Sequence, residues 1–327
     1  MSEYKEIKGI KVQDLGADPP APFVGEVWYN NSSGDLKYFA IQPAAWASGG
    51  TMPTGKSGAA GAGTQTAGLV MGGDTYPSVP SSSFEYDGST WTVGGTMSVD
   101  RDSNPGGAGT QTAGLVFGGE TPAPALTDAT EEYDGSSWTA GGNLPTALRL
   151  LAGCGTQTAG LSFGGYDNTT PTNATNEYNG STWTAGGNLG ISRNQLAGAG
   201  TQTAGLAFGG YDTGYSTSTE EYNGTSWTAG GSLNNGRKQL GGAGIQTAAL
   251  AFAGSTSTTP RTTLTEEYDG SAWTASANMN LERYYVAGCG TQTAGLAMGG
   301  YNPSNLPMPE SEEFSGGGPA TLIIGTD

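Results

Sequence analysis

Carboxylates and cations are the side chains best able to do chemistry in this sequence, because it contains no histidine and only two cysteines, Cys154 and Cys289. Histidine is the usual general base near neutral pH and the commonest nitrogen ligand of zinc and copper. Two cysteines alone do not make a thiolate cluster. We therefore expect no transition metal and no cofactor, although Asp and Asn side chains in loops leave calcium open.

Adjacent glutamates are the first candidates for an acid–base pair. They recur as Glu131-Glu132, Glu220-Glu221, Glu266-Glu267 and Glu312-Glu313. Neighbours on a strand point to opposite faces of the sheet, and a catalytic pair is needed once rather than four times. We therefore predict a structural role for these glutamates, with contacts to neighbouring sheets, and no enzymatic activity.

Six cations occupy a regular position, six to eight residues before a recurring GTQTAGL segment. They are Lys56, Arg101, Arg149, Arg193, Arg237 and Arg283. If the segments surround an axis, these side chains form a ring of positive charge at one mouth of a channel, which suits an anion or an acidic sugar. The alternative is that each cation pairs with a carboxylate of its own sheet.

The GTQTAGL segment, or a close copy, starts at Gly63, Gly109, Gly155, Gly200, Gly244 and Gly290, and so repeats every 44 to 46 residues. A period of this size indicates repeated supersecondary units. The copy from Arg193 to Gly231 predicts four short strands: QLAGAG, AGLAFGG, TEEY and SWTA. Asp-Gly or Asn-Gly joins the last two strands and favours a tight hairpin with positive φ at both turn positions.

Six units of four antiparallel strands predict an all-β fold, a six-bladed β-propeller. The Gly-Gly pair after the second strand, the Glu-Tyr-Asp/Asn-Gly of the third and the Trp of the fourth resemble the kelch family from about residue 46 to 314. Trp46 precedes the first GTQTAGL, and the last unit lacks a Trp. We expect the Trp46 segment to complete the last blade and close the ring. The predicted domains are an arm and hairpin (1–45), the propeller (46–315) and a C-terminal tail (316–327).

The two ends of such blades differ in character. The loops after the second strands vary in sequence and length, and they carry Tyr76, Tyr166, Tyr211, Tyr215 and Tyr301 among Asn, Ser, Thr and Pro. Variable loops on a rigid scaffold are common binding sites, and this composition is typical of adaptable binding surfaces. We predict a binding face here; the alternative is loop variation without a ligand. Cys154 and Cys289 fall at equivalent positions on opposite blades, so we expect them to be buried and unpaired.

The first 45 residues do not follow the repeat. Gly25–Asn30 and Ser33–Tyr38 predict a hairpin with its turn at residues 31–34, after a Pro-rich extended stretch. The GEVWYN…GDLKY order followed by GTQTAGLxFGG repeats resembles structural proteins of tailed bacteriophages, especially marine ones. This resemblance implies a virion protein whose arm anchors it to other virion proteins. The anchoring residues would be Ile7, Ile10, Val12, Trp28 and Tyr29.

The net charge of −17 argues against a nucleic-acid partner, and no apolar run is long enough for insertion in a membrane. The expected protein is made in the host cytoplasm and carried by the virion in several copies. It would serve as a tail fibre or spike adhesin that binds a host-surface glycan or protein, or as a head-surface decoration. The alternatives are a non-viral carbohydrate- or protein-binding propeller and a glycan lyase or glycosidase with carboxylate and Tyr chemistry.

Overall fold

The computed structural model describes residues 12–75, 81–123 and 125–324. These residues form strands and no helix, so the fold is all-β, and no described helix could cross a membrane. The chain divides into two compact units. The small unit comprises Met1–Ala44 and Gly316–Asp327, and the large unit comprises Ala45–Ser315.

The large unit contains six four-stranded antiparallel sheets, here numbered 1 to 6. Sheets 1 to 3 are β5 (Ala60–Thr64), β6 (Ala67–Met71), β7 (Ser82–Tyr86) and β8 (Trp91–Thr96); β9 (Gly106–Thr110), β10 (Ala113–Phe117), β11 (Thr130–Tyr133) and β12 (Trp138–Ala140); and β13 (Ala152–Thr156), β14 (Ala159–Phe163), β15 (Thr175–Tyr178) and β16 (Trp183–Ala185). Sheets 4 and 5 are β17 (Ala197–Thr201), β18 (Ala204–Phe208), β19 (Thr219–Tyr222) and β20 (Trp227–Ala229); and β21 (Gly241–Ile245), β22 (Ala248–Phe252), β23 (Thr265–Tyr268) and β24 (Trp273–Ala275). Sheet 6 is β25 (Ala287–Gly290), β26 (Ala294–Met298), β27 (Met308–Ser315) and β4 (Ala45–Lys56).

The strand prediction from the repeat is confirmed, with shifted ends. TEEY and SWTA form β19 and β20, while the first strand begins two residues later than expected. Small residues fill the first strands, whereas the second strands carry the core side chains, such as the fully buried Leu161 and Phe163. Alternating small and large residues let neighbouring sheets pack face to face.

The Asp-Gly and Asn-Gly loops differ from the tight two-residue turn that we predicted. Tyr86 pairs with Trp91, so the loop between β7 and β8 holds four residues. Only Gly88 has positive φ, because Asp87 uses its side chain to close the loop. Its Oδ1 accepts from the backbone N–H groups of Ser89 and Thr90. The aspartate therefore acts through an Asx turn rather than through a left-handed backbone.

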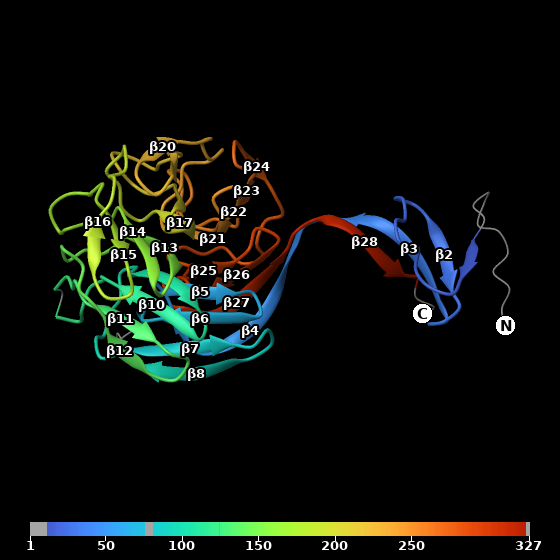
Figure 1. Cartoon of the computed structure of the whole chain (residues 1–327), viewed down its shortest axis with the longest axis horizontal. Coiled ribbons are helices and arrows are strands. Elements are labelled where there is room, and N and C mark those ends of the chain that lie inside the picture. The colour runs from blue at the N-terminus through green and yellow to red at the C-terminus, as the bar shows by residue number, and fades with distance from the viewer. Residues whose placement is uncertain (1–11, 76–80, 124, 325–327) are drawn as a thin grey trace. The chain divides into compact units, whose positions relative to one another are not determined.

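The first strands of the six sheets contact one another in the order β5, β9, β13, β17, β21 and β25, and β25 also contacts β5. Figure 1 shows β5, β13, β17, β21 and β25 gathered around the middle of the large unit. Within sheet 6, β27 pairs with β4, including Phe314 with Trp46. The repeated sheets are consistent with a β-propeller.

The glutamine of each GTQT segment explains why this segment is repeated so faithfully. Its Nε2 donates to two backbone carbonyls of the preceding sheet, at 2.6–3.2 Å. The six residues are Gln65, Gln111, Gln157, Gln202, Gln246 and Gln292. Buried carbonyls left open by a strand end need such partners. The GTQT turns thus join adjacent sheets.

The second glutamate of three of the four pairs, Glu132, Glu221 and Glu313, forms another link between sheets, as predicted. Tyr178 Oη donates to Glu132 Oε1 of the preceding sheet at 2.6 Å, and Tyr268 does the same to Glu221. Burial, together with the hydrogen bond to the glutamate, raises the pKa of both tyrosines to about 12. The fourth-strand Trp completes the link, since Trp183 Nε1 donates to Thr130 Oγ1 at 2.9 Å.

One junction departs from this pattern. Sheet 6 has Phe314 where the other sheets have Tyr, so Glu267 of sheet 5 lacks a tyrosine partner and accepts from Ser276 Oγ at 2.5 Å instead. Ser276 replaces a glycine: at the equivalent Gly230, a Cβ atom would lie 2.7 Å from Tyr268 Oη. The missing hydroxyl of Phe314 therefore makes room for Ser276, which restores a donor to the glutamate.

This compensation predicts coupling between the two positions. Phe314→Tyr alone should destabilise the protein by about 1–3 kcal/mol, because the new hydroxyl meets the Ser276 side chain. Adding Ser276→Gly should recover most of the loss, because the Tyr–Glu–Gly arrangement of the other junctions is restored. Urea unfolding of the wild type, both single variants and the double variant measures the coupling energy. Strictly additive effects would show that the two side chains do not share this space.

The small unit is one sheet of four strands in the order β1 (Gln13–Leu15), β2 (Val27–Asn30), β3 (Asp35–Gln42) and β28 (Gly318–Ile323). The predicted hairpin is confirmed, with Val27 opposite Tyr38 and Asn30 opposite Asp35. The expected C-terminal tail requires a correction, because β28 pairs along β3. Its alternating side chains and the otherwise open β3 edge explain the pairing.

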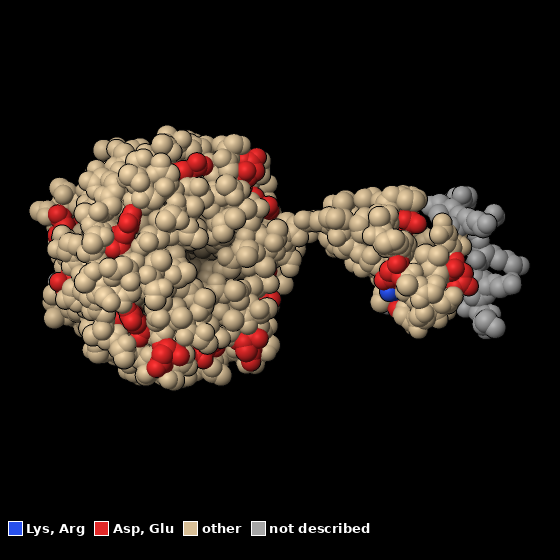
Figure 2. Space-filling view, in the orientation of Figure 1, with Lys and Arg blue, Asp and Glu red and all other residues tan. Residues whose placement is uncertain are grey.

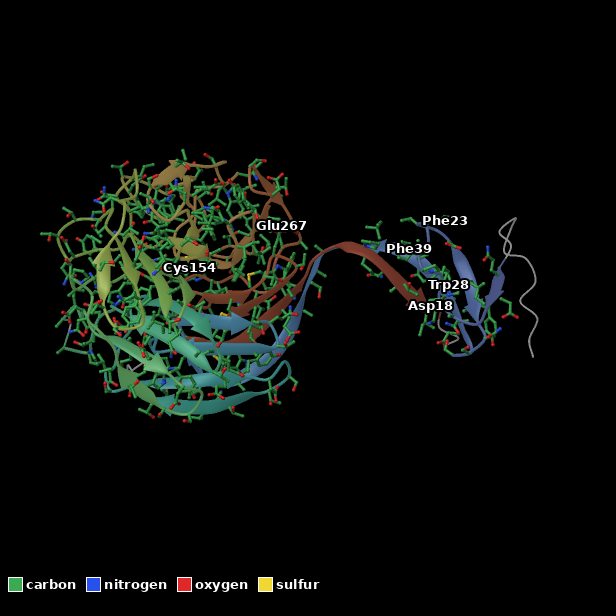
Figure 3. All side chains as sticks on the ribbon, viewed as in Figure 1. Asp18, Phe23, Trp28, Phe39, Cys154 and Glu267 are labelled. Atoms are coloured by element: carbon green, nitrogen blue, oxygen red, sulfur yellow. The ribbon has the colours of Figure 1, made fainter. Side chains whose placement is uncertain are left out.

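Asp18 organises this unit. Its carboxylate accepts from Trp28 Nε1, Asn30 Nδ2 and Lys37 Nζ at 2.7–3.1 Å. The bonds from Asn30, Lys37 and Trp28, in that order, lower the pKa of Asp18 to about 2. Figure 3 shows Asp18 beside Trp28 in the small unit.

Candidate functional site

At one end of each sheet in the large unit, the loop after the second strand meets the segment before the first. An isolated bridge joins the two in every sheet: Ser57–Asp74, Asp102–Glu120, Arg149–Tyr166, Asn194–Tyr211, Lys238–Ser255 and Tyr284–Tyr301. The bridges occupy equivalent places but differ in side-chain type. We call this end, with its bridges and loops, the variable end.

One aromatic group at the variable end spans sheets 4 and 5. The rings of Tyr211 and Tyr215 meet edge to face, with centroids 5.8 Å apart. Lys238 Nζ lies over both rings, 4.6 Å and 5.3 Å from their centroids. Burial lowers the pKa of Lys238. A cation against partly exposed tyrosines offers stacking surface and hydrogen-bond donors to a ligand.

A second group lies at sheet 6 and contains three tyrosines. Tyr284 lies 5.4 Å from the rings of both Tyr285 and Tyr301. Arg261 stacks over Tyr284 and donates from Nη2 to Asn305 Oδ1 at 2.6 Å. The group thus joins loops of sheets 5 and 6 through aromatic and amide side chains.

The predicted binding tyrosines therefore lie at one end of the sheets, but in three separate places. Tyr211 and Tyr215 share one group, Tyr301 belongs to the second, and Tyr166 lies under the Arg149 guanidinium at 5.7 Å. Tyr76 lies outside the described residues. The surface resembles a set of small aromatic sites rather than one groove.

The predicted ring of six cations at a channel mouth requires a correction. Four of its members are buried and pair with glutamates of their own sheets, which was the alternative interpretation. The pairs are Arg101–Glu131 at 2.6 Å, Arg193–Glu220 at 3.1 Å, Arg237–Glu266 at 2.8 Å and Arg283–Glu312 at 2.7 Å. All four arginine side chains are 0% exposed, so they present no guanidinium to a ligand. Burial lowers the pKa of these arginines, and the paired glutamates oppose that effect.

The other two members of the proposed ring have different surroundings. Lys56 is buried, donates to the Gly72 carbonyl at 2.7 Å and lies over the Phe84 ring. Burial lowers the pKa of Lys56 to about 8. Arg149 is one residue out of register: it occupies a bridge position, and it pairs with Glu120 at the variable end. Figure 2 shows a face of the large unit with carboxylates and no visible Lys or Arg.

Next to the bridges, backbone groups of the six sheets bond to one another in sequence. N–H groups donate to carbonyls at 2.8–3.0 Å from Gly58 to Tyr285, Tyr285 to Gln239, Gln239 to Gln195, Gln195 to Leu150, Leu150 to Ser103, and Asn104 to Gly58. We call these residues the backbone ring. All have φ between 50° and 59°, although only one is glycine. Left-handed backbone at non-glycine residues is strained, and such strain is concentrated at functional sites.

The cavity enclosed by the first strands has few side chains that could bind a ligand or react. Ala, Gly and the two cysteines line it. Cys154 and Cys289 are free and buried, as predicted. Burial raises the pKa of both thiols to about 12. Figure 3 shows Cys154 near the middle of the large unit. Among the described residues, no group of three His, Cys, Asp or Glu side chains could hold a metal ion.

The predicted anchoring residues also need a correction. Trp28 is 0% exposed and belongs to the core of the small unit, because its indole packs and bonds within the sheet. Tyr29 is partly buried in β2, and Val12 is partly buried just before β1. Ile7 and Ile10 lie outside the described residues. Among the described residues of this unit, the large apolar side chains that are exposed are instead Phe23, Val24, Ile41, Ile323 and Ile324.

Sequence reasoning missed Tyr284, Tyr285, Lys238 and Asp102 at the variable end. Alignment of the repeats on GTQTAGL could have found them, because these residues fall on the bridge and backbone-ring positions that vary between copies. Comparisons of the chain with protein-family models and with curated proteins found no match.

Proposed function

We propose that Ala45–Ser315 form a closed, six-bladed, kelch-like propeller that acts as a non-enzymatic binding module. Three kinds of link support closure between sheets 6 and 1: Tyr86 donates to Glu313, Trp91 to Ser311, and Gln65 to two carbonyls of sheet 6. Trp46 supports the junction of sheets 5 and 6, since its Nε1 donates to Thr265 Oγ1 at 3.0 Å.

The contrast between the two ends of the sheets carries the binding proposal. At the GTQT end, the same glutamine makes the same two bonds in all six sheets. At the variable end, tyrosines meet lysine, arginine and amide side chains that differ between sheets. A rigid scaffold with one conserved and one diversified end suits recognition, and partly exposed tyrosines suit glycans or protein surfaces.

We further propose that the chain is a structural protein of a phage virion, synthesised in the host cytoplasm and present in several copies. The resemblance of the N-terminal hairpin and repeats to tailed-phage proteins supports this assignment. The small unit would face the particle, where residues 1–12 and the exposed apolar side chains contact other virion proteins. The variable end would face the host cell as a fibre or spike adhesin, or decorate the head. A non-viral binding propeller is the competing proposal.

Particle assembly and cell attachment test these roles separately. Ile7→Asp, Ile10→Asp and Val12→Asp together should reduce incorporation into particles while leaving the large unit folded. Tyr166→Ala, Tyr211→Ala and Tyr215→Ala together should leave incorporation intact and reduce adsorption to cells at least about tenfold, the scale expected when stacking contacts are lost. The matched control is Thr112→Ala, Thr158→Ala and Thr203→Ala, at exposed positions of the GTQT end.

The control triple variant should adsorb like the wild type. Loss of incorporation by the tyrosine variant, with normal incorporation of the arm variant, would invert the proposed orientation. Absence of the chain from purified particles would favour the non-viral proposal.

A further inference from the structure

A pocket of about 130 Å³ at the variable end combines two tyrosines of the second group with two carboxylates. Ser57, Gly58, Asp74, Asp102, Ser103, Tyr285 and Tyr301 line it. These residues come from sheets 1, 2 and 6. The pocket therefore exists only where three sheets meet.

Members of the strained backbone ring shape this pocket. Gly58, Ser103 and Tyr285 belong to the ring, with φ of 59°, 55° and 55°. The Gly58 N–H donates to the Tyr285 carbonyl, which holds the two sides of the pocket together. The same left-handed φ recurs at the other ring positions, so the ring hydrogen bonds set this conformation, and at Ser103 and Tyr285 it places the two residues at the pocket.

The polar atoms of the pocket favour a cation. Two carboxylates, Asp74 and Asp102, line it, and no lysine or arginine does. Tyr301 Oη already donates to Asp74 Oδ2. The Ser57 side chain is 1% exposed, and its hydroxyl makes no hydrogen bond of normal geometry, although it lies close enough to the Tyr301 hydroxyl to lower the pKa of that tyrosine. A buried hydroxyl without a partner is costly unless a ligand or water satisfies it.

The charges around Asp102 also favour binding of a cation in the pocket. Burial raises the pKa of Asp102, and Glu120 and Asp74 raise it further, while Ser103 and Arg149 oppose them. Arg149 already forms an ion pair with Glu120. A positive group bound beside Asp102 would relieve the repulsion between these carboxylates.

We propose that this pocket binds the protonated primary amine of an amino sugar. The carboxylates of Asp74 and Asp102 and the hydroxyls of Ser57 and Ser103 would accept from the ammonium group, and the rings of Tyr285 and Tyr301 would cover its carbon skeleton. The volume suits an ammonium and a few carbons, so the rest of the sugar would lie outside. The tyrosine walls favour an organic cation over a bare metal ion.

This inference names a ligand for the proposed binding end, and so it rests on the proposed function for the choice of a sugar. Its test needs neither particles nor cells. If glucosamine does not bind but the tyrosine variant still loses cell adsorption, only the present inference fails. If glucosamine binds but the tyrosine variant adsorbs to cells normally, the proposed adhesin role of the variable end fails instead.

Isothermal titration calorimetry of the full chain with glucosamine tests the proposal. N-acetylglucosamine, which has the same ring without the charge, should bind at least about tenfold more weakly, the scale of one charge-assisted hydrogen bond. Equal binding of the two sugars would overturn the proposal, and this comparison requires no variant. Nα-acetyl-lysine amide supplies the same ammonium from an amino acid, and its tighter binding would overturn the sugar assignment.

Asp102→Asn should weaken glucosamine binding at least about tenfold, because it removes one of two charged acceptors without changing shape. The matched control is Glu282→Gln, which makes the same charge change at an exposed position. Its affinity should stay within about twofold of the wild type, as expected for a screened surface charge. Equal losses in both variants, or binding of calcium chloride with no binding of glucosamine, would contradict the proposal.

Discussion

Replacing Arg237 with Met is expected to destabilise the protein by about 3–5 kcal/mol, because one partner of a buried ion pair is removed. Arg237 is fully buried and donates to Glu266 and to the carbonyls of Ala253 and Leu264. Without it, the Glu266 carboxylate stays buried with only Asn234 as a donor among its hydrogen-bond partners. Urea unfolding followed by far-ultraviolet circular dichroism measures the loss.

Two controls separate charge burial from packing. Arg149→Met removes a partly exposed partner of Glu120 and should cost less than about 1 kcal/mol. The double variant Arg237→Met, Glu266→Leu removes both buried charges and should recover much of the stability. Similar losses for Arg237→Met and Arg149→Met would contradict the placement of these two arginines.

Removal of β4 is expected to have the largest effect of all. A chain of residues 45–315 keeps β4 and all six sheets, whereas residues 57–315 lack the strand that pairs with β27. Loss of the buried Trp46 side chain alone should cost about 3–5 kcal/mol, and the lost strand pairing adds to this. The free edge of β27 should also promote aggregation.

Thermal unfolding and size-exclusion chromatography of the two truncated chains measure this effect. We expect the chain of residues 45–315 to unfold in one cooperative transition near that of the full chain, because the large unit keeps every junction. Equal stability of the two truncated chains would show that β4 does not close the ring.

Much of the large unit could be predicted from the repeat. The periodic Trp and the Glu-Tyr pairs indicated the third and fourth strands, and the displaced Trp46 indicated that the first residues of the unit belong with its last sheet. The replacement of Tyr by Phe314 and of Gly by Ser276 marks the same junction in the sequence. Neither substitution is informative until the structure shows that these two positions face each other across sheets, as the equivalent Gly230 and Tyr268 do.

The repeat predicted the positions of the cations along the chain but not whether they are buried or exposed. A spacing of six to eight residues before GTQTAGL fits both a channel mouth and a buried position, and the choice depends on the partner that the third strand supplies. Sheets with a buried Arg carry a Glu on that strand, as in Arg193 and Glu220. Sheet 3 has the buried Leu148 before Arg149 and has Asn176 on its third strand. That correlated change was visible in the sequence and separates Arg149 from the other arginines.

The pocket at the variable end could not be predicted, because its residues come from three repeats and depend on backbone conformation. Ser103 and Tyr285 face it through left-handed φ values that no residue type at those positions indicates. Asp74, Asp102 and Tyr301 belong to bridges whose pairing follows from the sheet geometry. Only the folded order of sheets 6, 1 and 2 brings them together.

Electron cryomicroscopy of phage particles tests whether the chain is a virion protein and how it is oriented there. We expect a six-bladed disc joined to the particle through the small unit, with the variable end pointing away from the particle surface. A disc whose variable end faces the particle, with the GTQT end exposed, would contradict this expectation.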